Sequence, residues 1–128
     1  MKNLAAAILL IFPSPCLAND QCMDTATSDE EIEKCASQEL DQAESSLDAI
    51  YKATLAELDR LISNGDKGSA EAKKQLIDSQ KKWSDFRKSD CDIVFYLNID
   101  GSIRIPETMN CMANHANRRS ELLKHLFD

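Results

Sequence analysis

The chain has 128 residues, of which 29% are charged, and it carries a formal net charge of −7. An acidic balance of this size argues against nucleic acid and anionic lipid as partners, because both attract positively charged surfaces. It favours basic proteins as partners, although surface acidity also serves simply to keep a small domain in solution. The length allows one domain with a single modest core.

Residues 1–18 have the three parts of a secretory signal peptide. Lys2 supplies a cationic head, an apolar run follows at 4–12, and small residues precede a cleavage point after Ala18. The apolar run is too short to span a bilayer. We therefore predict a signal peptide at 1–18, a single helical domain at 19–128, no stable membrane insertion, and a periplasmic or secreted location.

Four cysteines remain after this segment is removed: Cys22, Cys35, Cys91 and Cys111. In an exported domain an even number of cysteines predicts disulfides, here two of them and no free thiol. Zinc sites use closely spaced ligand pairs such as C-x-x-C, whereas the separations here are 13, 56 and 20 residues. We predict no metal site and no cofactor.

A long first helix is predicted at about 30–63. Ser28 and Glu31 have the spacing of a capping box at its start. Apolar and small side chains then recur at steps of three and four, at Ile32, Ala36, Leu40, Ala43, Leu47, Ile50, Thr54, Leu58 and Leu61. At about 1.5 Å per residue this helix is about 50 Å long. The glycine-rich stretch at 64–68 predicts a short turn between two antiparallel helices.

The second helix is predicted at about 69–90 and holds the only tryptophan of the chain. Its buried face is a stripe at steps of three and four, formed by Leu76, Gln80, Trp83, Arg87 and Cys91. This stripe combines a large apolar anchor, a half-buried cation and a sulfur that can tie the helix to another element. We therefore assign structural roles to Gln80, Trp83 and Arg87.

Residues 92–105 are expected to form an ordered, partly apolar connection, because they are rich in β-branched residues and are interrupted by Gly101. Pro106 then opens a third helix at a first helical position. The inner face of this helix is predicted to consist of Met109, Met112, Ala113, Ala116, Leu122, Leu123 and Leu126.

Antiparallel pairing across the 64–68 turn makes the numbers of facing residues on the first two helices sum to about 132. The largest side chain, Trp83, is then expected near Leu47 and Ile50. By the same register, Arg87 is expected near Glu44 and Asp48. A tryptophan at this seam would be the main apolar contact between the two helices.

The same register limits the disulfides. Cys91 would face Asp41, and Cys35 lies about 9 Å further along the first helix, which exceeds the usual Cα separation of a disulfide. The simplest connectivity is therefore Cys22–Cys35 and Cys91–Cys111. The expected fold is all-α, a disulfide-stapled antiparallel three-helix bundle with one long first helix.

Several of these residues occur in an order that resembles a known family. L-D-x-x-Y stands at 47–51 and Q-x-x-W-x-x-F-R-x-x-x-C at 80–91, followed by Gly101, Cys111 and Arg119. With the two earlier cysteines, this order is similar to the small exported bacterial proteins named after the lysozyme inhibitor LprI. The resemblance covers nearly all of the mature chain. It implies a periplasmic or secreted bacterial protein that inhibits lysozyme.

Asp48 and Tyr51 both belong to the L-D-x-x-Y motif at 47–51. Tyr51 ends it and is assigned a structural role together with the stripe on the second helix. Asp48 stands where the family usually has an asparagine, so the sequence departs from the pattern there.

No catalytic set emerges from the sequence. His115 has no serine or cysteine nucleophile fixed beside it by a recognisable motif. Residues 96–107 approach the spacing of a calcium loop, but Tyr96 occupies the first ligand position and Pro106 crowds the last. We predict a protein that is not an enzyme and binds a protein partner, such as a basic lysozyme or another cell-wall hydrolase. The alternative is an envelope accessory factor or an enzyme of unknown activity.

The partner site is predicted on the 92–105 connection. Its apolar residues lie outside the inner faces of the helices, at Phe95, Tyr96, Leu97 and Ile99. They could cover the end of the bundle where the first helix extends beyond the second, which is a common use of such a segment. The second interpretation is a loop pinned by flanking cysteines that projects the predicted partner-binding residues, Tyr96, Asn98, Asp100 and Arg104.

Overall fold

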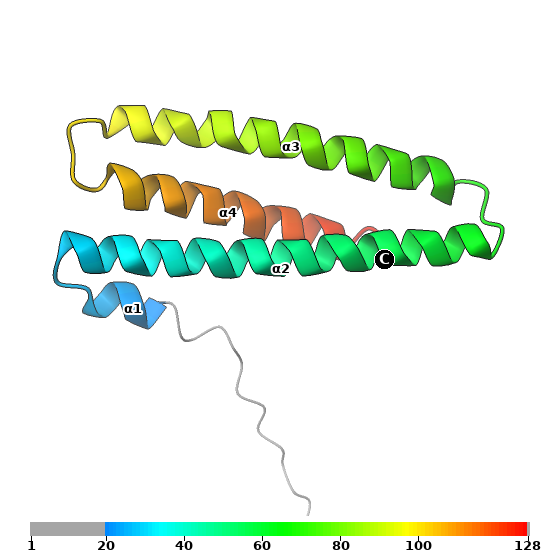
Figure 1. Ribbon diagram of the computed structural model, residues 1–128, viewed down its shortest axis with the longest axis horizontal. Coiled ribbons are helices and arrows are strands. Elements are labelled where there is room, and N and C mark those ends of the chain that lie inside the picture. Colours follow the sequence, from blue (N-terminus) through cyan, green and yellow to red (C-terminus); the bar gives the residue numbers. More distant parts are fainter. Residues whose placement is uncertain (1–19, 128) are drawn as a thin grey trace, which may run out of the picture.

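The structure is a computed structural model that describes residues 20–127, and these residues form a helical bundle without strands (Figure 1). The helices are α1 (Asp20–Thr25), α2 (Asp29–Ser63), α3 (Ser69–Leu97) and α4 (Arg104–Lys124). The predicted all-α bundle is confirmed, with α1 as an additional short helix. The predicted signal peptide lies outside the described residues. Within the described part, none of the helices has the length and apolar character that crossing a membrane requires.

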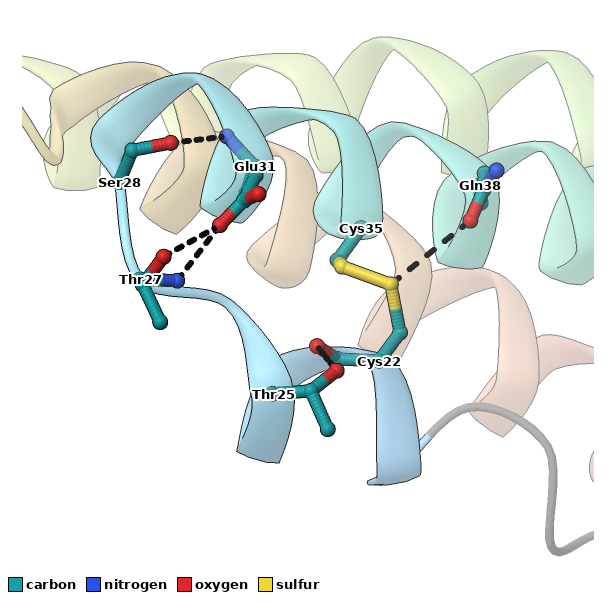
Figure 2. The surroundings of a disulfide bond; sticks show 7 residues. All are labelled: Cys22, Thr25, Thr27, Ser28, Glu31, Cys35 and Gln38. Atoms are coloured by element: carbon teal, nitrogen blue, oxygen red, sulfur yellow. Dashed lines mark hydrogen bonds between the residues drawn. A yellow bond between two sulfur atoms is a disulfide. The ribbon is translucent and has the colours of Figure 1, made fainter.

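The start of α2 is fixed by a local network of hydrogen bonds (Figure 2). The backbone N–H of Glu31 donates to the hydroxyl of Ser28 at 3.2 Å, as the predicted cap requires. The Glu31 carboxylate reaches one residue further back than a capping box does, and accepts from the N–H and hydroxyl of Thr27 at 2.7 and 2.9 Å. These bonds, led by the Thr27 N–H, lower the pKa of Glu31.

The short helix α1 is held against the start of α2 by the predicted Cys22–Cys35 disulfide (Figure 2). The two Cα atoms are 5.8 Å apart, within the usual range. A helix of six residues is not stable in water by itself. The covalent bond therefore supplies the tether that keeps α1 on the bundle.

The turn between α2 and α3 depends on two residues. Gly65 has a positive φ of 82°, which ends α2 in the left-handed conformation that glycine adopts most readily. The Asp66 carboxylate then accepts the N–H groups of Gly68 and Ser69 at 3.2 and 3.0 Å and the Ser69 hydroxyl at 2.5 Å. These bonds, with the hydroxyl as the largest cause, lower the pKa of Asp66. Asp66 thereby caps the start of α3.

Helices α2 and α3 run antiparallel, and α4 runs back alongside α2 (Figure 1). The most extensive helix contact is between α2 and α4, and the direct contact between α2 and α3 is smaller. Small buried residues allow helices to approach closely. On α2 and α4 they are Ala36, Ala43, Ala113, Ala116 and Ser120. The leucines of the central core cluster are Leu47, Leu58, Leu76 and Leu123.

The register between α2 and α3 agrees with the sequence prediction to within one residue. Arg87 is 7% exposed and pairs with Glu44. Its guanidinium lies 5.4 Å from the ring centroid of Trp83, and Trp83 packs, half-buried, against the core cluster. Asp48, the other predicted partner of Arg87, pairs instead with Lys52 on its own helix at 2.6 Å.

The second helix is longer than predicted. It continues beyond Asp90 to Leu97, so the connection to α4 is 98–103 and not 92–105. No glycine or proline interrupts this stretch, and the Lys88–Asp92 ion pair at 3.0 Å supports one more turn. The low helix propensity of β-branched residues is a weak effect that these local features override.

The last helix also begins earlier than predicted, at Arg104 and not at Pro106. Proline is tolerated there because the N–H groups of a first helical turn have no partner within the helix. The predicted inner face is correct for Ala113, Ala116 and Leu123 but wrong for two leucines. Leu122 and Leu126 are 55% and 50% exposed. Helix α4 buries only a narrow face and ends before the α2–α3 hairpin does. Leu122, beside that face, and Leu126, beyond the end of α4, are therefore exposed to solvent.

Candidate protein-binding site

The connection between α3 and α4 forms one end of the bundle (Figure 1). Four large apolar side chains around it are exposed to solvent: Tyr96 at 69%, Leu97 at 81%, Ile99 at 45% and Ile103 at 44%. We call these four residues the apolar tip. An exposed apolar group of this kind is a common mark of an interaction surface.

Two of the predicted partner-binding residues are occupied in holding the connection together. The Asn98 side chain donates to the carbonyl of Val94 at 2.9 Å and so continues the end of α3. The Arg104 guanidinium donates to the carbonyls of Ile99 and Gly101, both at 3.3 Å. Asn98 and Arg104 therefore fix the shape of the connection from within.

The other two predicted residues are directed differently. Tyr96 is mostly exposed, and its ring meets that of Phe95 edge-on, with 5.5 Å between centroids. Asp100 is exposed at the turn itself. The structure thus brings all four predicted residues to one end, with Tyr96 and Asp100 available at the surface. Ile103, which is 44% exposed, belongs to this surface although the sequence pattern does not predict it.

The base of the tip is fastened by the predicted Cys91–Cys111 disulfide, whose Cα atoms are 5.7 Å apart. Cys91 is 1% exposed, so this bond lies within the packed part of the bundle. A second tie joins the same helices, because the Nε2 atom of His115 lies 2.6 Å from a carboxylate oxygen of Asp90. The ring of Phe86 meets His115 edge-on at 5.7 Å. The apolar tip therefore stands on a rigid base, and the role of His115 there was not predicted.

The ligand atoms of Cys91, Cys111 and His115 lie within 4.8 Å of one another, as in a metal site. A cysteine ligates a metal through its thiolate. Both sulfurs are bonded to each other in the structure, so two of the three donors are not present in ligating form. The cluster acts instead as a covalent and polar tie between α3 and α4.

Acidic residues gather at the same end of the molecule. The first turn of α2 lies at the same end of the bundle as the end of α3 and the start of α4 (Figure 1), and it carries Asp29 and Glu30, which are exposed. Neither they nor Asp100 form an ion pair within residues 22–127. Exposed carboxylates that form no ion pair contribute a negative potential at this end, where Arg104 is the cation of the connection. This end therefore combines exposed apolar surface with carboxylates that form no ion pair.

The residues assigned structural roles lie away from the tip. Arg119 on α4 donates from Nε to the Gln80 side chain and from Nη2 to the Ser79 hydroxyl, both at 3.0 Å. Tyr51 packs, half-buried, on the core cluster together with Trp83. Gln80, Trp83 and Tyr51 thus bind the helices to one another.

Comparison with known proteins supports the resemblance noted in the sequence. A family model described as "Lysozyme inhibitor LprI" matches residues 22–123. The match runs from within α1 to the last turn of α4 and includes all four disulfide-bonded cysteines. No curated protein and no solved structure matches the chain.

Proposed function

Because this chain belongs to the lysozyme inhibitor LprI family, we propose that it is an exported, non-enzymatic protein that binds and inhibits a basic cell-wall hydrolase of the lysozyme class. The proposed contact surface is the apolar tip together with Asp100. The observation that carries this proposal is the group of four exposed apolar side chains on a disulfide-fastened base.

Rigidity is what makes this surface suited to binding. Exposed aromatic and aliphatic anchors supply much of the free energy of a protein interface. Ordering a flexible loop on binding costs free energy, and a loop that is already ordered avoids much of that cost. Here Asn98 and Arg104 hold the connection from within, and Cys91–Cys111 holds its base. Asn98 and Arg104 therefore contribute to binding by positioning Tyr96 and Asp100.

Charge selects the kind of partner. The carboxylates at the tip end that form no ion pair attract a basic protein and speed its association. Such steering weakens when salt screens the charges. We expect the association rate with lysozyme to fall as ionic strength rises, while the dissociation rate, set by the apolar contacts, changes little.

The test is the double variant Tyr96→Ala/Leu97→Ala, measured against purified lysozyme by surface plasmon resonance and by an inhibition assay. Both side chains are mostly exposed, so the thermal unfolding midpoint should stay close to that of the wild type. Binding should weaken by about 30-fold, as expected when two interface anchors are removed.

Ile77→Ala is the matched control, because Ile77 is a 49% exposed apolar residue near the opposite end of α3. It should bind like the wild type. Equal losses in both variants would place the binding surface elsewhere on the bundle. Absence of any lysozyme binding by the wild type would show that lysozyme is the wrong partner.

A further inference from the structure

A cavity lies at the opposite end of the bundle from the apolar tip. Helix α4 ends at Lys124, whereas the α2–α3 hairpin continues to its turn at 64–68 (Figure 1). The cavity has a volume of about 320 Å³ and lies beside the last turns of α4, at the place where this helix ends against the α2–α3 hairpin. Apolar side chains from three helices and the C-terminal segment line most of it: Leu58, Leu76, Leu122, Leu126 and Phe127.

One charged residue, Arg119, lines this apolar cavity. Its two hydrogen-bond partners, Gln80 and Ser79, are neutral. Within residues 22–127 no carboxylate forms an ion pair with it, in contrast to Arg60 and Arg87, which pair with glutamates. Partial burial lowers the pKa of the Arg119 guanidinium, because the charge loses contact with water.

A cation that faces an apolar cavity without a counter-ion is suited to a ligand that carries both an anionic head and an apolar tail. We propose that this cavity binds a single-chain carboxylate amphiphile, with the acyl chain among Leu122, Leu126 and Phe127 and the carboxylate on Arg119. The guanidinium keeps donor groups free beyond the two used for Gln80 and Ser79, because arginine has five N–H donors.

The charge and size of the site define the ligand further. One guanidinium balances one carboxylate, whereas a phosphate monoester carries nearly two charges and would leave one uncompensated in an already acidic chain. If each heavy atom occupies about 30 Å³, as a water molecule does in the liquid, the cavity of about 320 Å³ has room for about ten. One acyl chain of about ten carbons fills that volume, with its carboxylate oxygens at Arg119 on the cavity wall, and a second chain does not fit. This proposal stands independently of hydrolase binding, because the two sites lie at opposite ends.

The probe is decanoate, added to the purified protein and followed by isothermal titration calorimetry, with decanol as the uncharged comparison. Arg119→Met should weaken decanoate binding by about tenfold or more, since it removes the charged hydrogen bonds. It should leave decanol binding nearly unchanged. Arg118→Met is the matched control, because it makes the same change at the next residue, which is exposed and does not line the cavity. It should bind decanoate like the wild type.

A second pair of variants keeps the test valid if Arg119→Met fails to fold. Leu126→Asp places a negative charge in the cavity wall at a half-exposed position and should abolish decanoate binding. Leu97→Asp makes the same change at the tip and should leave it intact. The proposal is overturned if decanoate does not bind, or if Leu126→Asp and Leu97→Asp bind it equally. A different result would also overturn the proposal: the wild type does not bind decanoate but forms a dimer, and Leu126→Asp is monomeric. That result would show that a second copy of the chain covers this surface.

Discussion

The two ends of this bundle are built in different ways. At the tip end, disulfides fasten α1 to α2 and α3 to α4, and a six-residue connection is hydrogen-bonded internally. At the opposite end, which holds the α2–α3 turn and the Arg119 cavity and which we call the open end, no disulfide occurs within the described chain, and the turn is held by one glycine and one aspartate. Both ends expose apolar side chains, but at the tip they project from a fastened frame and at the open end they border a cavity. A small bundle can thus keep apolar surface exposed at both ends. Disulfides support that surface at the tip end, and helix packing supports it at the open end.

The largest expected effect concerns packing at the open end, where Leu122 and Leu123 are neighbours on α4. Leu123 is 1% exposed and Leu122 is 55% exposed. Leu123→Ala should lower the free energy of unfolding by about 2–5 kcal/mol, because it leaves a cavity in the core. Leu122→Ala should change it by less than about 0.5 kcal/mol, as at most surface positions. Urea denaturation with the disulfides intact measures both, and similar losses would mean that α4 is rotated from the position described.

The next effect concerns the covalent support of the tip. Replacing Cys91 and Cys111 with serine should cost about 3 kcal/mol in the chain-entropy model. Amide hydrogen exchange in the 98–103 connection should accelerate, because the base of the tip is no longer fastened. The comparison variant replaces Cys22 and Cys35, which should release α1 and leave exchange at the tip unchanged. Faster exchange at the tip in both variants would show that the two disulfides do not act locally.

The smallest effect distinguishes the two turns. Asp66→Asn at the open end should lower the thermal unfolding midpoint at pH 7 by a few degrees, because the carboxylate caps α3. Asp100→Asn at the tip should have little effect, since Asn98 and Arg104 hold that connection.

The contribution of Asp66 depends on pH in a defined direction. Its pKa is lowered in the folded state from an ordinary value of 3.8, so the stabilisation is present above pH 3.8 and is lost as the pH falls through the lowered pKa. The difference between wild type and Asp66→Asn should therefore shrink in acid. A difference that stays constant down to the lowest pH would show that the carboxylate charge is not responsible.

Much of the fold followed from the sequence because its signals are local and periodic. Apolar residues that recur every three or four positions on α2 predicted its buried face. The position of the 64–68 turn predicted the register that pairs Arg87 with Glu44. That register also led to the correct disulfides. Tyr96, Leu97 and Ile99 are exposed, as expected of apolar residues with no position on an inner helix face, and their role in partner binding stays a prediction.

The errors share one physical origin, which is that tertiary context decides how far a helix extends and how wide a face it buries. The sequence near Ile93 and Val94 has low helix propensity, yet α3 continues through it. Leu122 and Leu126 have the spacing of core residues, yet both are half-exposed, because α4 buries only a narrow face and ends at Lys124, before Leu126. The Arg119 cavity could not be predicted, because it arises from the unequal lengths of α4 and the α2–α3 hairpin.

The pairing of the cysteines has a consequence for how the chain matures. Each disulfide joins consecutive cysteines, across 13 and 20 residues, so neither encloses the other. A mispaired Cys35–Cys91 bond would close a much longer loop, at an additional entropic cost of about 1 kcal/mol relative to Cys22–Cys35. The two bonds can therefore form in either order as the chain emerges, and oxidative folding has little need to pass through disulfide reshuffling, one of the slow steps in protein maturation.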